Sequence, residues 1–318
     1  MMETADFYTE TSGGATSSSA YWIYAGDGVR LRVGLWKAEN VCNGSVLLFP
    51  GRTDYIEQYG RVADELVKFG YSTLAIDWRG QGLADRVTED PRTGHVKRFA
   101  DYQKDVAAML NAAKDLGLPK PWHLIGHSMG GCIGLRALME GLPVAACAFT
   151  APMWDIHISP VERLAALPLT WAAQALGKGH IYAPGYSGQT YVLRAGFEGN
   201  TLTNDPEMYQ HWVNLAKNLP DRQTGGPSMG WLYQSLREMR SLSKMTSPNI
   251  PCISFCGTQD HIVGIAAIHD RMNRWPGGIY KVIDNAKHEL LLEMPTVRQS
   301  VMAEICDLFG AVKQGSNA

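Results

Sequence analysis

The segment HLIGHSMGG at 123–131 contains the residue of this chain best suited to nucleophilic chemistry. Its central part has the form G-x-S-x-G, and it lies directly after an apolar run and before a segment of helical spacing. At such a strand-to-helix turn the serine backbone is strained, and small flanking residues relieve the crowding. The hydroxyl then lies near the positive end of the helix. We therefore predict Ser128 as a nucleophile, with Gly126 and Gly130 as the glycines of the turn.

A serine hydroxyl needs a base, and the base needs a carboxylate to orient it. In a sheet with this kind of turn the chain order is serine, acid, histidine, which excludes every histidine before the serine. The segment KVIDNAKHELLLEMP places His288 in a loop between a strand and a helix. His269 falls inside a helical pattern, and His261 is the immediate neighbour of the candidate acid. We predict His288 as the base.

The acid is expected in a loop after the preceding strand. Asp260 lies there, in FCGTQDHIVG, and it is our prediction. Asp155 in APMWDI is the main rival, because some folds of this type place the acid one strand earlier. Asp284 is too close to His288 along one loop to be favoured.

The hydrophobic pattern of the chain predicts the fold that positions these residues. Strand-like runs alternate with segments of helical spacing, and such alternation predicts a parallel sheet with helices on both faces. The strand-like runs are 20–38 (two strands joined through 26–28), 45–51, 71–80, 121–128, 144–152, 250–260 and 279–284. The helical segments are 55–70, 99–117, 129–141, 264–275 and a last one after Pro295.

The alternation stops near Met153 and resumes near residue 248. The intervening stretch is rich in Trp, Tyr, Met and Leu and mostly helical in its spacing, which predicts an inserted helical module. The predicted division is a flexible Gly/Ser/Thr-rich tail at 1–19, a first part of the sheet domain at 20–152, the insertion at 153–247 and a second part of the sheet domain at 248–318.

The composition narrows the class of protein. The chain has 318 residues, enough for one large domain with an insertion, and a formal net charge of −2, which gives no support for nucleic-acid binding. The six cysteines are spread without metal-ligand spacing, and Cys252 and Cys256 would lie about 13 Å apart on one strand, too far for a disulfide. No apolar run approaches about 18 residues, and the acidic start lacks the features of a secretory signal. We expect reduced thiols, no metal, no cofactor and a cytoplasmic location.

With these motifs the sequence resembles the α/β-hydrolase superfamily, and more narrowly its lysophospholipase and monoacylglycerol lipase branch. The resemblance spans about 22–309 and implies a mostly parallel eight-stranded sheet flanked by helices, with a mainly helical cap inserted after the sixth strand. The chain departs from the common pattern where many members have His-Gly instead of Pro50-Gly51, and where many have R-G-H-G instead of R-G-Q-G. The resemblance rests on LLFPGRTDYIEQYG, AIDWRGQGLADR, LIGHSMGG, GTQDHIV with NAKHELLLE, and, within the insertion, NTLTNDPEMYQ and GGPSMGWLYQSL, which look similar to bacterial lysophospholipase-like members.

The resemblance implies an oxyanion hole built from the backbone N–H groups of Arg52 and Met129. The residue after the nucleophile and a loop after an early strand are also where such donors are expected on this kind of sheet. We predict that the Arg52 side chain pairs with Asp54 or Glu57 rather than with an anionic lipid head group. We also predict structural roles for Asp77 and Arg79, and a substrate pocket that includes Trp154, Met229 and Trp231.

Together these features predict a serine hydrolase that cleaves esters of single-chain lipids, either lysophospholipids or monoacylglycerols, through an acyl-enzyme. The lipid ester is the expected partner, and transient contact with a membrane surface is left open. Three alternatives stay open: a broad carboxylesterase or thioesterase, a non-catalytic binding protein on the same fold, and a peptidase releasing N-terminal residues. The peptidase would need an acidic group for the substrate amine, for which Glu198, Asp205 and Glu207 are available.

Overall fold

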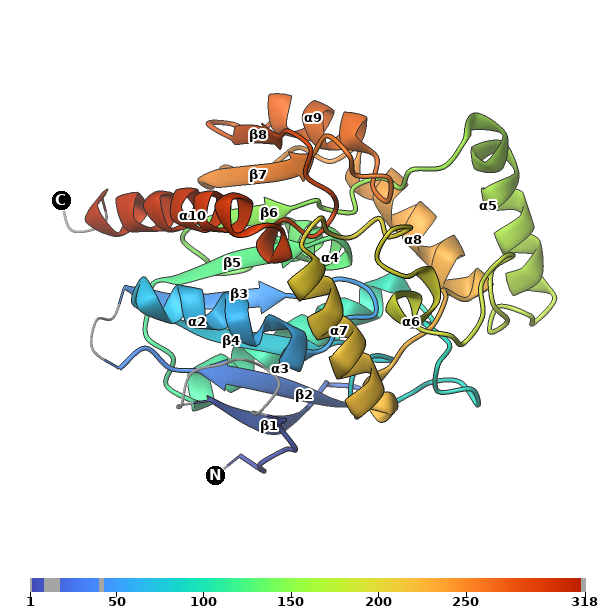
Figure 1. The fold of residues 1–318 in the computed structure, drawn as a ribbon, viewed down its shortest axis with the longest axis horizontal. Helices are drawn as coiled ribbons and strands as arrows, with labels where there is room; N and C mark the ends of the chain where they lie inside the picture. The colour runs from blue at the N-terminus through green and yellow to red at the C-terminus, as the bar shows by residue number, and fades with distance from the viewer. Residues whose placement is uncertain (1, 9–17, 40–42, 316–318) are drawn as a thin grey trace.

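The computed structural model describes residues 2–8, 18–39 and 43–315. In these residues a single eight-stranded sheet runs in the order β1-β2-β4-β3-β5-β6-β7-β8 (Figure 1). β2 is antiparallel to both of its neighbours and the other pairs are parallel, so the predicted mostly parallel sheet is confirmed. The strands are Ser18–Tyr24 (β1), Arg30–Trp36 (β2), Gly44–Phe49 (β3), Tyr71–Asp77 (β4), Trp122–His127 (β5), Cys147–Thr150 (β6), Cys252–Gly257 (β7) and Ile279–Ile283 (β8).

Helices cover both faces of the sheet because the central strands are apolar on both sides. Successive side chains of a strand point to opposite faces. In β3, Val46 and Leu48 pack in one core cluster with α2 and α10, whereas Leu47 and Phe49 pack in the other with α3, α4 and α9. These helices are Gly60–Lys68 (α2), Tyr102–Asp115 (α3), Met129–Met139 (α4), Ile265–Asn273 (α9) and Pro295–Gly315 (α10).

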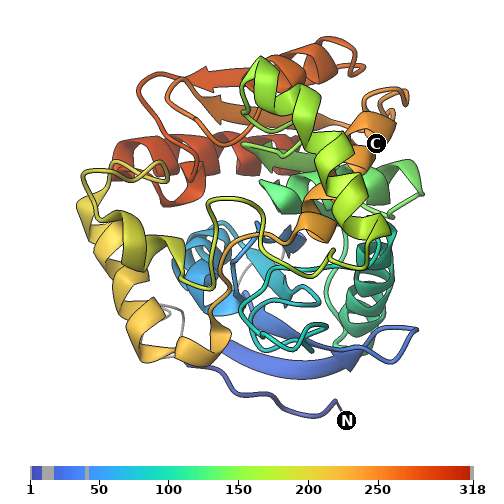
Figure 2. The ribbon, with the colours of Figure 1, turned by 90° about the vertical axis from the view of Figure 1, so that its right-hand side faces the viewer.

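The insertion between β6 and β7 forms a helical cap beside the carboxyl ends of the parallel strands (Figures 1 and 2). Its α7 helix starts at the N-cap Asp205, and α8 starts at Ser228, whose hydroxyl accepts from the Trp231 N–H at 3.0 Å. The cap helices are Pro160–Ala175 (α5), Tyr191–Ala195 (α6), Pro206–Asn218 (α7) and Met229–Leu242 (α8), and short 3-10 turns lie at Ile56–Tyr59 (η1), Phe99–Asp101 (η2), Pro220–Arg222 (η3) and Leu290–Leu292 (η4).

The tail predicted at 1–19 lies mostly outside the described residues, which omit 1 and 9–17. Residues 2–8 run beside β1, where the Ala5 N–H donates to the Ala20 carbonyl at 2.9 Å. β1 itself begins at Ser18. Cys42 also lies outside the described residues, and the other five cysteines are buried and free. No helix in the described ranges is both long and apolar enough to cross a membrane.

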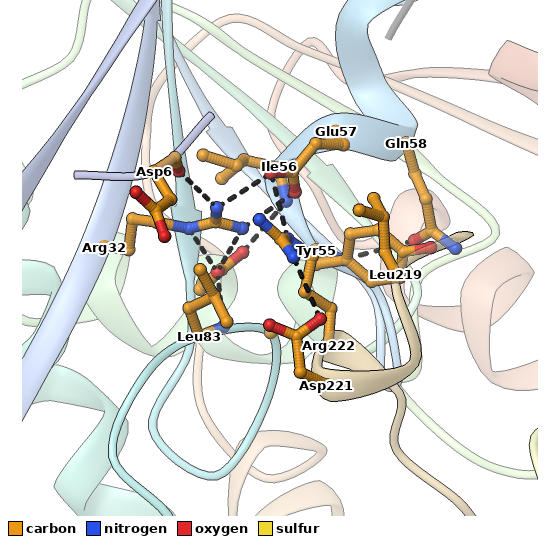
Figure 3. Close-up of polar contacts among 12 residues, drawn as sticks. Asp6, Arg32, Tyr55, Ile56, Glu57, Gln58, Leu83, Leu219, Asp221 and Arg222 are labelled. Atoms are coloured by element: carbon orange, nitrogen blue, oxygen red, sulfur yellow. Dashed lines mark hydrogen bonds and ion pairs between the residues drawn. The ribbon is translucent and has the colours of Figure 1, made fainter. Parts of the chain in front are cut away.

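A buried ionic cluster ties the cap to the sheet (Figure 3). It consists of Arg32, Glu57, Asp77 and Arg222, and we call it the Arg32 cluster. The Arg32 guanidinium contacts Glu57 at 2.7 Å and Asp77 at 2.8 Å. Arg222, which belongs to the cap turn η3, contacts the same Glu57 at 3.2 Å. The cluster therefore joins β2, η1, the end of β4 and the cap.

A second ionic group holds the loop that follows β4. The Arg79 side chain contacts Asp105 of α3 at 2.6 Å and Asp27 of the β1–β2 turn at 2.9 Å. Asp77 accepts the backbone N–H groups of Ile56 and Leu83 at 2.9 and 2.8 Å. The contacts of Asp77 and Arg79 are thus those of the predicted structural ties between loops.

Candidate active site

Ser128 stands at the turn between β5 and α4 with φ 49° and ψ −117°, a strained conformation for a residue with a side chain. A Cβ atom on Gly130 would lie 1.9 Å from the carbonyl oxygen of Phe49, so only glycine fits there. At Gly126 a Cβ would lie 3.0 Å from the Cα of Gly131, which is also tight. The turn therefore requires glycine on the helix side of the serine and favours it on the strand side.

The structure brings together the three residues predicted for the nucleophile, base and acid. His288 Nε2 lies 2.9 Å from Ser128 Oγ, and His288 Nδ1 lies 2.7 Å from Asp260 Oδ2. Asp260 follows β7 and His288 follows β8, so three loops at one edge of the sheet supply the group. All three side chains are buried. A hydroxyl, an imidazole and a carboxylate thus form one hydrogen-bonded chain.

The Asp260 carboxylate is held in its ionised form. Its Oδ1 atom accepts the backbone N–H groups of Ile262 and Val263 at 2.8 and 3.1 Å. Burial by itself would raise the pKa of Asp260, but the adjacent His288 imidazole and these N–H groups keep the pKa below its usual value. A carboxylate in this state can orient the imidazole and stabilise its protonated form.

The rival acid Asp155 lies after β6 and points elsewhere. It forms an ion pair with Arg163 of α5 at 2.9 Å. The other late histidines are also apart from the serine: the His261 ring packs against His157, and the exposed His269 lies beside Asn273. The geometry therefore favours Asp260 over Asp155.

The two predicted oxyanion donors lie at the edge of the same turn. Met129 is the first residue of α4, and Arg52 follows β3 in a loop that packs against the serine, since a Cβ on Gly51 would lie 3.3 Å from the Ser128 Cβ. Within the described part of the chain, no acceptor takes the N–H of Arg52 or Met129. Two unused N–H groups beside a nucleophile are what a developing oxyanion requires.

The side chains of Asp54 and Gln81, for which the sequence predicted no such role, hold this loop in place. The Asp54 carboxylate accepts the Gly51 N–H and the Tyr59 hydroxyl, each at 2.7 Å. Burial raises the pKa of Asp54 to about 6, with a further contribution from nearby negative charge. The side-chain oxygen of Gln81 accepts the N–H of Thr53, whose φ is 76°. Gln81 occupies the position where the R-G-H-G pattern has histidine, and that departure was the available signal for its role.

A second histidine–carboxylate pair lies beside the first and was also missed. His127 Nε2 lies 3.1 Å from Glu289 Oε1, and the His127 and His288 ring centroids are 4.9 Å apart. Burial alone would lower the pKa of His127, but the Glu289 carboxylate reverses this effect and raises the pKa to about 9. Both members adjoin Ser128 or His288 in sequence. That adjacency was the only available signal, and it does not indicate a pairing.

A cavity of about 410 Å³ opens above Ser128, between the sheet domain and the cap. Of the three residues predicted to line the pocket, only Trp231 does so. Trp154 instead stacks on Trp275 with ring centroids 6.3 Å apart, because the chain after β6 turns back into the core. Met229 is buried at the start of α8, outside the cavity wall. Those two predictions are wrong. The lining includes Arg52, Ser128, Tyr186, Tyr191, Arg194, Trp212, Trp231, Leu232, Ile262 and His288.

The acidic residues considered for amine binding also lie outside the cavity wall. Asp205 caps α7 by accepting from the N–H groups at the start of that helix. Glu207 pairs with Arg61 at 2.8 Å on the surface. Neither is therefore placed to receive the amino terminus of a peptide above Ser128.

The predicted pairing of the Arg52 side chain with Asp54 or Glu57 is wrong. Both carboxylates are occupied: Glu57 belongs to the Arg32 cluster, and Asp54 holds the loop. Arg52 Nη1 instead donates to the Gly225 carbonyl at 2.9 Å, and the guanidinium carbon lies 5.5 Å from the ring centroid of Trp231. The Arg52 side chain thus belongs to the cavity wall.

One grouping among the described residues has metal-ligand atom types within 4.8 Å of one another: His127, His288 and Glu289. Its nitrogen atoms are already hydrogen-bonded. His127 Nε2 contacts Glu289, and the two His288 nitrogens contact Ser128 and Asp260. The absence of a cofactor stays a prediction.

Comparison with known proteins gives three kinds of match. The Hydrolase_4 family model, described as "Serine aminopeptidase, S33", matches residues 41–295. The lysophospholipase L2 of Escherichia coli K12 is 32% identical over 278 residues, 83% of this chain and 79% of that protein. The monoacylglycerol lipase of Mycolicibacterium smegmatis is 26% identical over 283 residues, 84% and 91% of the two chains. The crystal structure of a soluble variant of the Saccharomyces cerevisiae monoglyceride lipase, in complex with a substrate analogue, superposes with a TM-score of 0.68 at 19% identity, covering 98% of this chain and 95% of that one, and shows a shared fold.

Proposed function

The chain belongs to the Hydrolase_4 family of α/β hydrolases, and we propose that it is a serine hydrolase that cleaves the carboxylic ester of single-chain lipids. One observation carries the proposal: the hydrogen-bonded chain from Ser128 through His288 to Asp260 lies at the wall of a cavity shared by sheet domain and cap. This constellation matches the geometric roles of a nucleophile, a base and an orienting acid.

The geometry supports acyl-enzyme chemistry. Ser128 Oγ attacks the ester carbonyl while His288 Nε2, 2.9 Å away, takes its proton. The protonated imidazole is stabilised by Asp260 and then gives the proton to the departing alcohol. A water molecule, activated by the same imidazole, attacks the acyl-enzyme and releases the fatty acid.

The backbone N–H groups of Arg52 and Met129 are proposed to bind the oxyanion of each tetrahedral intermediate. Both N–H groups lack a protein acceptor among the described residues. Loss of one such donor reduces kcat by about 10²- to 10³-fold in a well-studied protease. Because Gln81 and Asp54 hold the loop of Arg52, we assign them a positioning role.

The choice of a lipid ester rests on the cavity and on the relatives. A volume of about 410 Å³ lies within the range of about 300–1,000 Å³ that is typical of small-molecule sites. Trp212, Leu232 and Ile262 give the wall apolar surface suited to an acyl chain. The relatives named lysophospholipase L2 and monoacylglycerol lipase make single-chain lipids the first substrates to test.

The test compares Ser128→Ala, Asp260→Asn and Asp155→Asn on a short p-nitrophenyl ester and on a lauroyl monoglyceride. We expect Ser128→Ala to lose turnover and labelling by a fluorophosphonate, and Asp260→Asn to lose most turnover. Asp155→Asn is the matched control and should keep it. Full turnover by Ser128→Ala would overturn the proposal, and wild-type protein that resists the fluorophosphonate would indicate a binding protein instead. Faster turnover of thioesters or of aminoacyl amides would indicate a thioesterase or an aminopeptidase.

A further inference from the structure

The Arg52 side chain has far fewer partners than its chemistry allows. A guanidinium carries five N–H donors and stays protonated at neutral pH. Only one protein acceptor is found for it in the described part of the chain, the Gly225 carbonyl at 2.9 Å from Nη1. No described carboxylate forms an ion pair with it. Burial lowers the pKa of Arg52, and the negative charge of nearby Asp54 offsets this effect only in part.

The other enclosed arginines have more acceptors than Arg52. Arg32 and Arg79 each bind two carboxylates. Arg271 also has no carboxylate partner, but its guanidinium donates to two backbone carbonyls and to the Ser247 hydroxyl. Among these arginines of the described chain, Arg52 is distinguished by having a single acceptor.

The protein nevertheless makes a specific place for this guanidinium. A Cβ on Gly94 would lie 2.9 Å from Arg52 Nη1, so glycine at that position leaves room for the side chain. The Gly94 N–H also donates to the Gly226 carbonyl at 3.2 Å, which holds the two flanking segments together. Trp231 contributes its ring face, and cation–π contact stabilises a desolvated cation. We call Arg52, Gly94, Gly225 and Trp231 the arginine niche.

The niche lies on the substrate path. Arg52 lines the same cavity as Ser128, and its own backbone N–H is the proposed oxyanion donor. Its side chain therefore starts beside the scissile carbonyl and runs along the cavity wall. In a glycerol-based lysolipid the phosphate is separated from the ester by the glycerol carbons, a chain of bonds comparable in length to the arginine side chain. Arg194 adds a second cation to the same wall.

The acidic groups of the cavity wall do not compete for the guanidinium. Asp54 is engaged with Gly51 and Tyr59, and Glu289 is paired with His127. A neutral glycerol would leave the remaining donors of Arg52 without a charged partner. A phosphate oxygen would satisfy them, because planar guanidinium groups bind phosphate through paired N–H donors.

We propose that the Arg52 guanidinium binds the phosphodiester of the substrate head group, so that the chain is selective for lysophospholipids over monoacylglycerols. This inference rests on the proposed function for the reaction itself. It adds a specificity-determining side chain to a residue whose backbone serves catalysis.

The kinetic test compares two lauroyl substrates below their micelle-forming concentrations, a lysophosphatidylglycerol and a monoglyceride. We expect wild type to favour the phospholipid, and Arg52→Met to lower the ratio of the two kcat/KM values about 10- to 100-fold, the loss expected for a charge-assisted hydrogen bond. The ratio is the readout because changes in the loop affect both substrates alike. Arg52→Lys should recover part of the ratio.

Two further variants sharpen the kinetic test. Gly94→Ala leaves the sequence of the Arg52 loop intact and should lower the same ratio by displacing the guanidinium. Arg240→Met, which removes an exposed arginine of α8 outside the cavity, is the matched control and should leave the ratio unchanged. A wild type that prefers the monoglyceride, or an Arg52→Met ratio equal to that of wild type, would overturn the inference.

A binding test keeps this inference separate from the reaction. In the Ser128→Ala background, titration calorimetry with the same two lipids measures affinity without turnover. Arg52→Met should weaken the phospholipid about 10- to 100-fold and the monoglyceride little. Should neither lipid be hydrolysed by wild type, the proposed function fails while this measurement still decides the role of Arg52. Glycerol 3-phosphate, which lacks the acyl chain, should bind much more weakly, and equal affinity would assign the niche to a free phosphate ester.

Discussion

Arg32 and Arg52 lie close together in the sequence, yet their surroundings differ completely. Arg32 is fully buried, and its guanidinium contacts Glu57 (Figure 3). It also contacts Asp77. Burial alone would lower the pKa of Arg32, but these two carboxylates raise it. The Arg52 guanidinium contacts one carbonyl, that of Gly225, and one aromatic ring, that of Trp231. The Arg32 guanidinium, whose donors are all used within the protein, stabilises the fold. The Arg52 guanidinium, which has unused donors in a cavity, is available to a ligand.

The largest expected effect is on the Arg32 cluster. Arg32→Met removes the ion-pair partner of the buried Asp77 and leaves the buried Glu57 paired with Arg222, and breaking such a pair costs about 3–5 kcal/mol. Arg52→Met removes one hydrogen bond to a carbonyl and should change the free energy of unfolding by about 1 kcal/mol or less. Urea unfolding of the two variants measures both. If both variants lost the same free energy of unfolding, Arg52 would stabilise the fold as much as Arg32 does, and the distinction between the two arginines would be wrong.

The His127–Glu289 pair gives an intermediate effect that depends on pH. The pKa of His127 is raised from 6.5 to about 9, so its stabilisation is fully present below pH 6.5 and is lost as pH rises through about 9. Burial alone would raise the pKa of Glu289, but the adjacent His127 lowers it below its usual value, so the contribution of Glu289 is lost only in acid. Below pH 6.5 a rise of this size in the pKa of His127 corresponds to a stabilisation on the order of 3 kcal/mol.

Glu289→Gln tests this pair. The difference in unfolding free energy between wild type and the variant should be largest at pH values of about 5 to 6.5 and should shrink as pH rises towards about 9 and above. The control is Asp270→Asn, which breaks an exposed pair with Arg274 and should give a flat difference over the same range. A Glu289→Gln difference that stays constant up to pH values of about 10 would mean that His127 is neutral in the folded protein.

Much of this molecule follows from the sequence because its signals are local or ordered along the chain. The G-x-S-x-G turn needs only neighbouring residues, and the strand pattern orders the loops that carry Asp260 and His288. The alternation of strands and helices predicted the sheet, and its interruption predicted the cap.

The partners of charged and aromatic side chains could not be predicted from the sequence. A group that is already paired with one residue is not free to pair with another. Glu57 is five residues from Arg52, yet it pairs with Arg32 and with Arg222, which are 25 and 165 residues away. Trp154 was expected in the pocket as an aromatic residue of the insertion, but the chain after β6 returns to the core and the Trp154 indole N–H donates to the Gly131 carbonyl at 3.1 Å. Such competition is set by packing in three dimensions and not by spacing in sequence.

The smallest expected effect concerns the exposed pair of Arg163 and Asp155, 2.9 Å apart with side chains 48% and 28% exposed. Exposed pairs contribute about 0–1 kcal/mol, since water and salt already stabilise both charges. Arg163→Met should therefore lower the free energy of unfolding by less than about 1 kcal/mol at low salt, and the loss should vanish near 1 M NaCl, where the screening length is about 3 Å. The loss from Arg32→Met should persist at that salt concentration, because ions do not enter the Arg32 cluster. If 1 M NaCl removed the loss of stability in both Arg163→Met and Arg32→Met, burial would not explain why Arg32 stabilises the fold. The proposal that Arg52 binds a ligand would then rest on the lipid selectivity alone.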